Sequence, residues 1–154
     1  MTSGSKDSGR ALTAAGTEEI ERVGASLSKQ GFKFDIVAAS PLKRAKDTAE
    51  ILNLGLKRQA RVEVWPELSP EGARDALYMR LSRLRPDSSV LLVGHEPYLT
   101  TAMSEIAGAA GGHPRVRISL KKGGLAKMSV SGFSPRVEGE LRWLLTPKQI
   151  RKMA

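Results

Sequence analysis

The chain has 154 residues, 40% of them apolar, so it fits one domain with a core large enough to fold alone. It has no cysteine, which excludes disulfides, thiolate metal sites and a cysteine nucleophile. A net charge of +9, from 25 basic and 16 acidic residues, favours anionic partners such as phosphates, acidic protein surfaces or nucleic acid.

The N-terminus is polar and rich in Ser and Gly, which predicts a flexible tail over residues 1–10 and a single domain over residues 11–154. The tail has no apolar stretch that could serve as a signal peptide, and no run elsewhere reaches the length of a membrane span. We therefore expect a cytoplasmic protein without a membrane partner.

The first ordered element is expected to be a helix that begins after Thr13, a good N-cap residue, and ends before Gly31. Its apolar positions recur at spacings of three and four, at Ile20, Val23 and Leu27.

A buried strand is expected over residues 34–39, a short apolar run that stops at Ser40-Pro41. A helix follows as far as residue 53, with Ser40 as its N-cap and Pro41 at its first position. A second strand is expected over residues 61–65.

The middle of the chain repeats this alternation. A helix is expected to open at Pro70 and to close at residues 86–88. Residues 89–93 form the strongest strand, apolar enough to be covered on both faces, and a helix follows over residues 98–106. Three further strands are predicted, over residues 116–120, 125–130 and 140–145.

Alternating strands and helices predict an α/β fold with a mainly parallel central sheet and helices on both faces. Sites in such sheets form at the carboxyl ends of the strands. Two strand ends carry candidate chemistry here, in residues 40–44 and 94–97.

The first of these segments places Arg44 one turn into a helix, near free backbone N–H groups and the positive end of the helix dipole. A guanidinium can hold two phosphate oxygens at once, which a lysine cannot do. The segment therefore outlines an anion site. A solvated surface arginine is the alternative, and this motif alone favours neither.

The second segment places His95 in a turn directly after a buried strand, where a role in function is favoured over a buried structural role. Its imidazole can donate to a phosphate oxygen or transfer a proton near neutral pH. The other histidine, His113, lies in a Gly-rich segment without a charged partner and is expected to be an ordinary loop residue. Two such histidines and no cysteine make no recognisable metal cluster, so neither a metal nor a cofactor is expected.

Three weaker candidates remain open. Glu67 can be a proton donor or simply a loop carboxylate, and the second is favoured. Lys121 and Lys122 can contact phosphate or only solvate a turn. Nucleic-acid binding is disfavoured, because no single basic block dominates and aromatic residues are only 5% of the chain.

The order of these motifs resembles the SixA-type phosphohistidine phosphatases of the histidine phosphatase superfamily. The resemblance covers nearly all of the chain after Ser8 and rests on five segments in family order. They are residues 10–16 (Arg-Ala-Leu-Thr-Ala-Ala-Gly), 40–50 (Ser-Pro-Leu-Lys-Arg-Ala-Lys-Asp-Thr-Ala-Glu), 66–68 (Pro-Glu-Leu), 94–97 (Gly-His-Glu-Pro) and 143–147 (Trp-Leu-Leu-Thr-Pro).

The resemblance implies a metal-free hydrolase of phosphohistidine or phosphomonoesters that works through a phosphohistidine intermediate. Its partner would be a phosphorylated protein or a small phosphomonoester. Arg44 would clamp the phosphoryl oxygens, His95 would stabilise the transferring group, and Ser40 would cap the phosphate-facing helix. Lys122 would be a further contact to substrate. Asp47 stands where the family usually has Gln, which adds a carboxylate near the site.

One family feature has no counterpart in this sequence. The family begins with a central strand that ends in Arg-His-Gly, whose histidine is the nucleophile. Here 11 residues precede Leu12, none of them is His, and no Arg-His-Gly occurs elsewhere. The natural protein can have a longer N-terminus and be active, or the chain can be a short form that binds phosphate without turnover.

The longer form is favoured, because loss of a central strand would leave backbone groups unpaired and apolar surface exposed. We expect little or no turnover from this chain. A noncatalytic module that binds phosphate or phosphoproteins is the alternative function, and nucleic-acid binding is the third.

Overall fold

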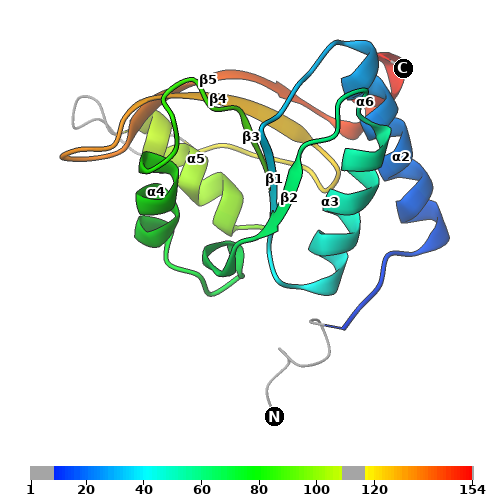
Figure 1. Ribbon diagram of the computed structural model, residues 1–154, viewed down its shortest axis with the longest axis horizontal. Helices are drawn as coiled ribbons and strands as arrows, with labels where there is room; N and C mark the ends of the chain where they lie inside the picture. The colour runs from blue at the N-terminus through cyan, green and yellow to red at the C-terminus, as the bar shows by residue number, and fades with distance from the viewer. Residues whose placement is uncertain (1–8, 109–116, 154) are drawn as a thin grey trace.

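A computed structural model describes residues 9–108 and 117–153, and it shows helices packed on a parallel sheet (Figure 1). A short 3₁₀ helix, Pro66–Leu68, follows the second strand. The helices and strands are α2 (Ala14–Lys29), β1 (Ile36–Ala39), α3 (Lys43–Gly55), β2 (Arg61–Val64), α4 (Arg74–Ser82), β3 (Val90–Val93), α5 (Tyr98–Gly108), β4 (Leu125–Gly132), β5 (Glu138–Leu145) and α6 (Pro147–Met153).

The central sheet has the order β2-β1-β3, and β1 pairs in parallel with both neighbours. In this register Ala39 lies opposite Val64 on one side and Val93 on the other, so the carboxyl ends of all three strands meet at one edge. Strands β4 and β5 form a separate antiparallel pair. The residues that follow β1 and β3 are therefore brought together.

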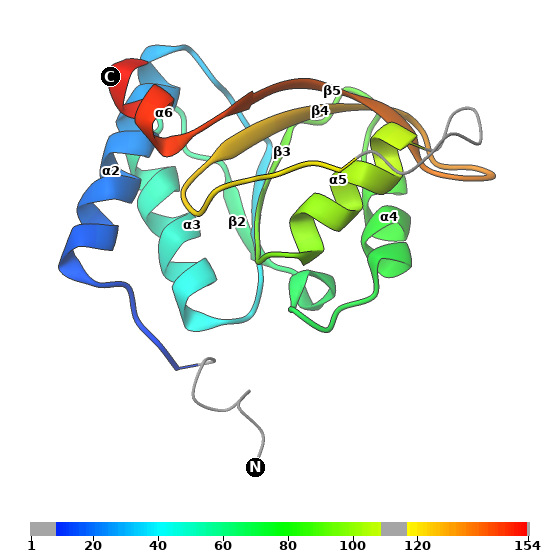
Figure 2. The same ribbon diagram turned by 180° about the vertical axis from the view of Figure 1, so that it is seen from behind.

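Each face of the central sheet is covered by a different set of helices. One core cluster joins Val37 and Ala39 to Leu27 of α2 and Leu52 of α3. A second cluster lies on the opposite face, where β1 meets α4 and α5, and includes Ile36, Ala38, Leu77, Tyr98 and Ile106. The two sets of helices stand on opposite sides of the sheet in Figures 1 and 2. The predicted α/β fold, with a parallel sheet and helices on both faces, is confirmed.

The caps of α2 follow from its sequence. The Thr13 side chain accepts a hydrogen bond from the Gly16 N–H at 3.0 Å, and it satisfies one of the free donors of the first turn. Gly31, just beyond the helix, has a φ of 79°, a conformation that glycine adopts without strain. Both predicted ends of this helix are confirmed.

Two helices begin later than expected. The helix predicted from Pro41 begins at Lys43, because Leu42 is still extended and its N–H donates to the Ser40 hydroxyl. The N-cap is therefore Leu42, and the prediction of Ser40 as the N-cap was wrong. The helix predicted from Pro70 begins at Arg74, because a turn comes first, closed by the Gly72 N–H.

The last third of the chain also differs from expectation. Residues 117–120 form no strand, and residue 116 lies outside the described residues. Strands β4 and β5 are present, and each is longer than predicted. Helix α6 was not predicted, and the Ile150 carbonyl in it accepts a hydrogen bond from the Ser26 hydroxyl of α2. No helix within the described ranges is long and apolar enough to span a membrane.

Candidate functional site

The site begins where β1 and β3 end side by side. Ser40 directly follows β1, is fully buried, and donates its backbone N–H to the Val93 carbonyl at 3.0 Å. Two residues after β3, His95 places its Nε2 atom 2.7 Å from the Ser40 hydroxyl oxygen. The sequence predicts candidate chemistry in residues 40–44 and 94–97, each at the carboxyl end of a strand. These contacts join the two segments at one edge of the sheet.

The Ser40 hydroxyl links the imidazole to the start of α3. It accepts the Leu42 N–H at 3.2 Å, which leaves its own hydrogen free to be donated to Nε2 of His95. Alternatively, a protonated Nε2 donates to the hydroxyl oxygen. In either arrangement Ser40 fixes the position of the His95 ring relative to the helix that carries Arg44.

Arg44 lies in the first turn of α3, and its Nε atom is buried without a hydrogen-bond partner among the described residues. A buried charged donor without a partner is costly, so such a group is expected to meet an anion. The N-cap of α3 has no side-chain hydrogen bond, and its first turn has no acidic residue. A helix N-terminus without a side-chain cap, beside a guanidinium whose Nε has no partner among the described residues, is suited to bind a phosphate group.

The Asp47 carboxylate forms an ion pair with a lysine of its own helix. Its carboxylate lies 3.4 Å from the Lys43 ammonium on the same helix, four residues earlier. Part of its negative charge is therefore compensated locally, which limits repulsion of an incoming anion.

Glu67 is engaged in a structural ion pair. Two oxygens of its carboxylate accept from Nε and NH2 of Arg80, each at 3.0 Å, and the Arg80 guanidinium also stacks over the Trp65 ring. Burial acts to raise the pKa of Glu67, but the hydrogen bonds from Arg80, a backbone hydrogen bond and the charge of Arg80 together outweigh burial and lower the pKa. A group that donates a proton needs a raised pKa, so this geometry disfavours Glu67 as a proton donor.

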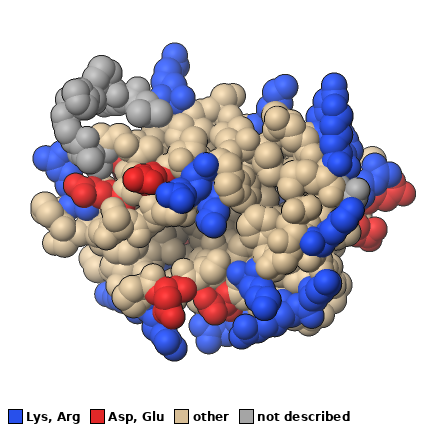
Figure 3. Space-filling model, turned by 90° about the horizontal axis from the view of Figure 1, so that it is seen from above, with Lys and Arg blue, Asp and Glu red and all other residues tan. Residues whose placement is uncertain are grey.

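Lys122 lies in an exposed turn before β4. Within the described residues, neither hydrogen bond of the Ser40 hydroxyl involves Lys122. His113 lies outside the described residues. Basic side chains stand around much of the edge of the face seen in Figure 3, and several lie next to one another along its lower right side.

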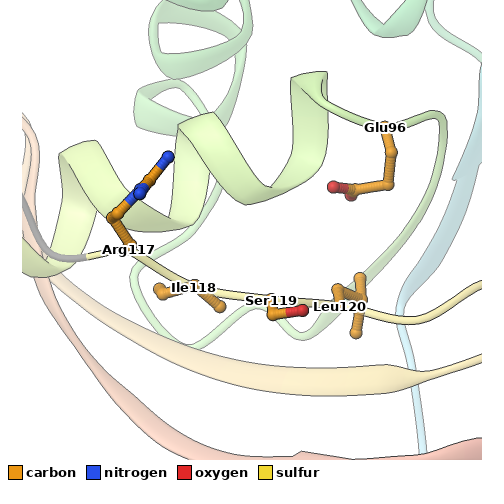
Figure 4. Close-up of a pocket in the computed structure, with 5 residues that line it drawn as sticks. All are labelled: Glu96, Arg117, Ile118, Ser119 and Leu120. Atoms are coloured by element: carbon orange, nitrogen blue, oxygen red, sulfur yellow. The ribbon is translucent and has the colours of Figure 1, made fainter.

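A cavity of about 500 Å³ lies next to the site, between the loop after β3 and the segment that precedes β4 (Figure 4). It is lined by Glu96 and by residues 117–120, among which Arg117 is a basic residue. The Thr100 hydroxyl donates to the Glu96 carboxylate at 2.6 Å. Neither Arg117 nor Glu96 was predicted as a site residue, because only the fold brings the loop after β3 and residues 117–120 together.

Comparison with known proteins identifies the family of the chain. The family model of the histidine phosphatase superfamily, branch 1, matches residues 2–70. An uncharacterized protein of Picosynechococcus sp. is 32% identical over 147 residues, covering 93% of this chain and 87% of that protein. The solved structure of the protein histidine phosphatase SixA complexed with tungstate is similar with a TM-score of 0.78 and 26% identity, covering 92% of this chain and 87% of SixA.

This chain belongs to the histidine phosphatase superfamily. A protein from Nakamurella multipartitia, described as a candidate phosphohistidine phosphatase SixA, has the same fold, with a TM-score of 0.69 and 23% identity over 92% of this chain and 87% of that one. In this histidine phosphatase, the strand register places the Ser40 and His95 segments at the carboxyl ends of β1 and β3, where sites of α/β proteins form.

Proposed function

We propose that this histidine phosphatase domain binds the phosphoryl group of a phosphorylated protein, with phosphohistidine as the substrate group. The observation that carries the proposal is the buried, unpartnered Nε of Arg44 at the free N-terminus of α3, four residues after Ser40. The similarity to SixA supports phosphohistidine as the substrate, and the net charge of +9 favours an acidic partner surface.

Each residue of the site would have a separate role in binding the phosphoryl group. Arg44 would hold two phosphoryl oxygens with its planar fork of donors, and the first N–H groups of α3 would hold a third oxygen. His95 would stabilise the negative charge that develops as the phosphoryl group is transferred. Ser40 would keep the imidazole in place. None of these roles needs a metal.

Transfer also needs a nucleophile, and the sequence holds two histidines, neither of which lies in an Arg-His-Gly motif. We therefore propose that this chain binds phosphate but turns substrate over slowly or not at all, and that a strand ending in Arg-His-Gly would complete the enzyme. The second candidate function, a noncatalytic module for phosphoproteins, is favoured by the same retained anion site.

The test compares this chain with a form extended at the N-terminus by an apolar strand that ends in Arg-His-Gly. Both are assayed with p-nitrophenyl phosphate and with a phosphohistidine protein, and Arg44→Ala in the extended form is the control. We expect turnover by the extended form alone, lost in the control. Robust turnover by the short chain would contradict the missing-nucleophile argument, whereas phosphate binding without turnover by either form would support the noncatalytic module.

Nucleic-acid binding, the third candidate, predicts an affinity for DNA or RNA that falls steeply with salt. Absence of binding at moderate salt would remove this candidate.

A further inference from the structure

Strand β2 forms one end of the central sheet, and no described strand pairs with its outer edge (Figure 1). Two of its apolar side chains, Val62 and Val64, are 37% and 46% exposed. Edge strands are commonly kept from pairing by lysine, proline or a bulge, and β2 contains none of these between Arg61 and Val64. Its edge is therefore open to a further strand.

The backbone groups that point to this edge belong to Val62 and Val64. The N–H groups of Arg61 and Trp65 donate toward β1, at 3.3 and 2.8 Å. Because backbone groups of alternate residues point to opposite edges of a strand, the N–H and C=O of Val62 and Val64 point outward. Pairing cannot continue to Ala60, whose N–H already donates to a side chain of α3 at 2.7 Å. The edge can therefore form only a short ladder.

The side chains of β2 divide into an apolar face and a charged face. Val62 lies opposite Val37, which packs with α2 and α3, so Val62 and Val64 lie on that side of the sheet. Arg61 and Glu63 lie on the other side, where the Arg61 guanidinium donates to the Glu63 carboxylate at 2.6 Å. These charges are opposite in sign, so a copy of the same strand that runs in the reverse direction is complementary to them.

We propose that β2 pairs in antiparallel orientation with β2 of a second copy of this chain, about a two-fold axis at Val62. In this register Arg61 faces the partner's Glu63, and Glu63 faces the partner's Arg61. The two Val62 side chains meet on the other face. A register centred on Glu63 would place two carboxylates directly opposite each other, which is destabilising. Charge therefore selects the register at Val62, and the two-fold axis closes the assembly at two copies.

The dimer leaves both phosphoryl sites accessible. Antiparallel pairing points the carboxyl ends of the two sheets in opposite directions, so the contact between Ser40 and His95 of each copy lies outside the paired edge. The paired strand is four residues long, so the interface is small and the association is weak. Pairing does not depend on phosphate binding or hydrolysis, and failure of the proposed function would leave this inference standing.

Analytical ultracentrifugation of the full chain from about 10 µM to 1 mM tests the proposal, a range suited to a small interface. We expect the mass of the wild type to rise with concentration toward that of two chains. Arg61→Glu places a second carboxylate opposite the partner's Glu63 and should weaken dimerisation by about tenfold or more. Arg22→Glu, at an exposed position of α2, makes the same change in net charge and should dimerise as the wild type does.

A mixture of two variants tests the register. Glu63→Lys alone places a lysine opposite the partner's Arg61 and should also weaken dimerisation. When Arg61→Glu and Glu63→Lys are mixed, each charge faces an opposite charge, so a mixed dimer is expected. Glu63 also accepts from Trp65 Nε1, so circular dichroism must show that the variant is folded. Val62→Lys, at a half-exposed position, is a second disruptive variant that does not touch this hydrogen bond.

Four results would overturn the proposal. One is a wild type that keeps the mass of a single chain over the whole range. Another is dimerisation of Arg61→Glu or Val62→Lys with the affinity of the wild type, which would place the interface elsewhere. An equal loss in Arg22→Glu would show that only net charge matters. A mixture of folded Arg61→Glu and Glu63→Lys that stays monomeric would rule out the register at Val62.

Discussion

At the scale of single residues, the site depends on how Ser40, Arg44 and His95 are held. Sequence alone could place Ser40 and His95 after two strands, because the apolar runs and their ends are local signals. It could not show that the Nε atom of Arg44 is buried without a partner among the described residues, since burial depends on the packing of the whole domain. The ion pair of Glu67 with Arg80 was equally hidden, because it joins a 3₁₀ helix to α4.

Removal of the Ser40 hydroxyl should cost stability. Ser40→Ala leaves the Leu42 N–H and Nε2 of His95 without this partner in a buried setting, and we expect the free energy of unfolding to fall by about 1–3 kcal/mol. Urea unfolding measures the loss. Ser82→Ala, at an exposed hydroxyl bonded to the Met79 carbonyl, is the matched control and should change little. An unchanged stability of Ser40→Ala would show that these bonds contribute nothing.

Because the pKa of Glu67 is lowered in the folded chain, part of the free energy of unfolding depends on pH. Because the folded pKa lies below the ordinary value of 4.5, this carboxylate stabilises the fold above that pH, and the contribution is lost as pH falls through the folded value. Glu67→Gln should therefore lower stability at neutral pH and flatten the curve below 4.5. Chemical unfolding over a pH series measures both effects, with Glu71→Gln, at an exposed position, as the control. If the free energy of unfolding fell with pH in the same way in the wild type and in Glu67→Gln, the lowered pKa of Glu67 would be contradicted.

At the scale of elements, helices and strands with strong local sequence signals could be predicted from the sequence. The cap at Thr13, the glycine at 31 and the apolar runs of β1 and β3 predicted those elements close to their observed bounds. The starts of α3 and α4 were misplaced, because proline at a first helical position was given more weight than the turns before each helix. Residues 117–120 have the apolar alternation of a strand, but β4 takes β5 as its partner.

Contact between α2 and α3 depends on two glycines. A Cβ atom at Gly55 would meet the backbone of Gly24 at 3.1 Å, and one at Gly24 would meet the Leu52 carbonyl oxygen at 3.3 Å. A larger side chain must push the helices apart.

We therefore expect Gly24→Leu to destabilise the fold by about 2 kcal/mol or more, despite the higher helix propensity of leucine. Thermal and urea unfolding test this. Ala25→Leu, on the exposed side of the same helix, is the control and should be close to neutral. A Gly24→Leu variant as stable as Ala25→Leu would show that the helices do not pack through these glycines.

At the scale of the whole molecule, alternation of strands and helices was enough to predict the fold class. It could not predict that the strands divide into a three-stranded and a two-stranded sheet, because strand order depends on long-range pairing. Among the described strands, β3 pairs with β1 alone and so lies at one end of the three-stranded sheet.

Calorimetric titration of inorganic phosphate into the wild type and Arg44→Lys is the most direct test of the central claim, that Arg44 and the start of α3 form a phosphoryl site. We predict one phosphate per chain and an affinity weakened by about tenfold in Arg44→Lys, because lysine cannot hold two oxygens with a planar fork. Lys46→Ala, at an exposed position of the same helix, should bind as the wild type does. Equal affinities of the wild type and Arg44→Lys, with circular dichroism showing both folded, would contradict the claim.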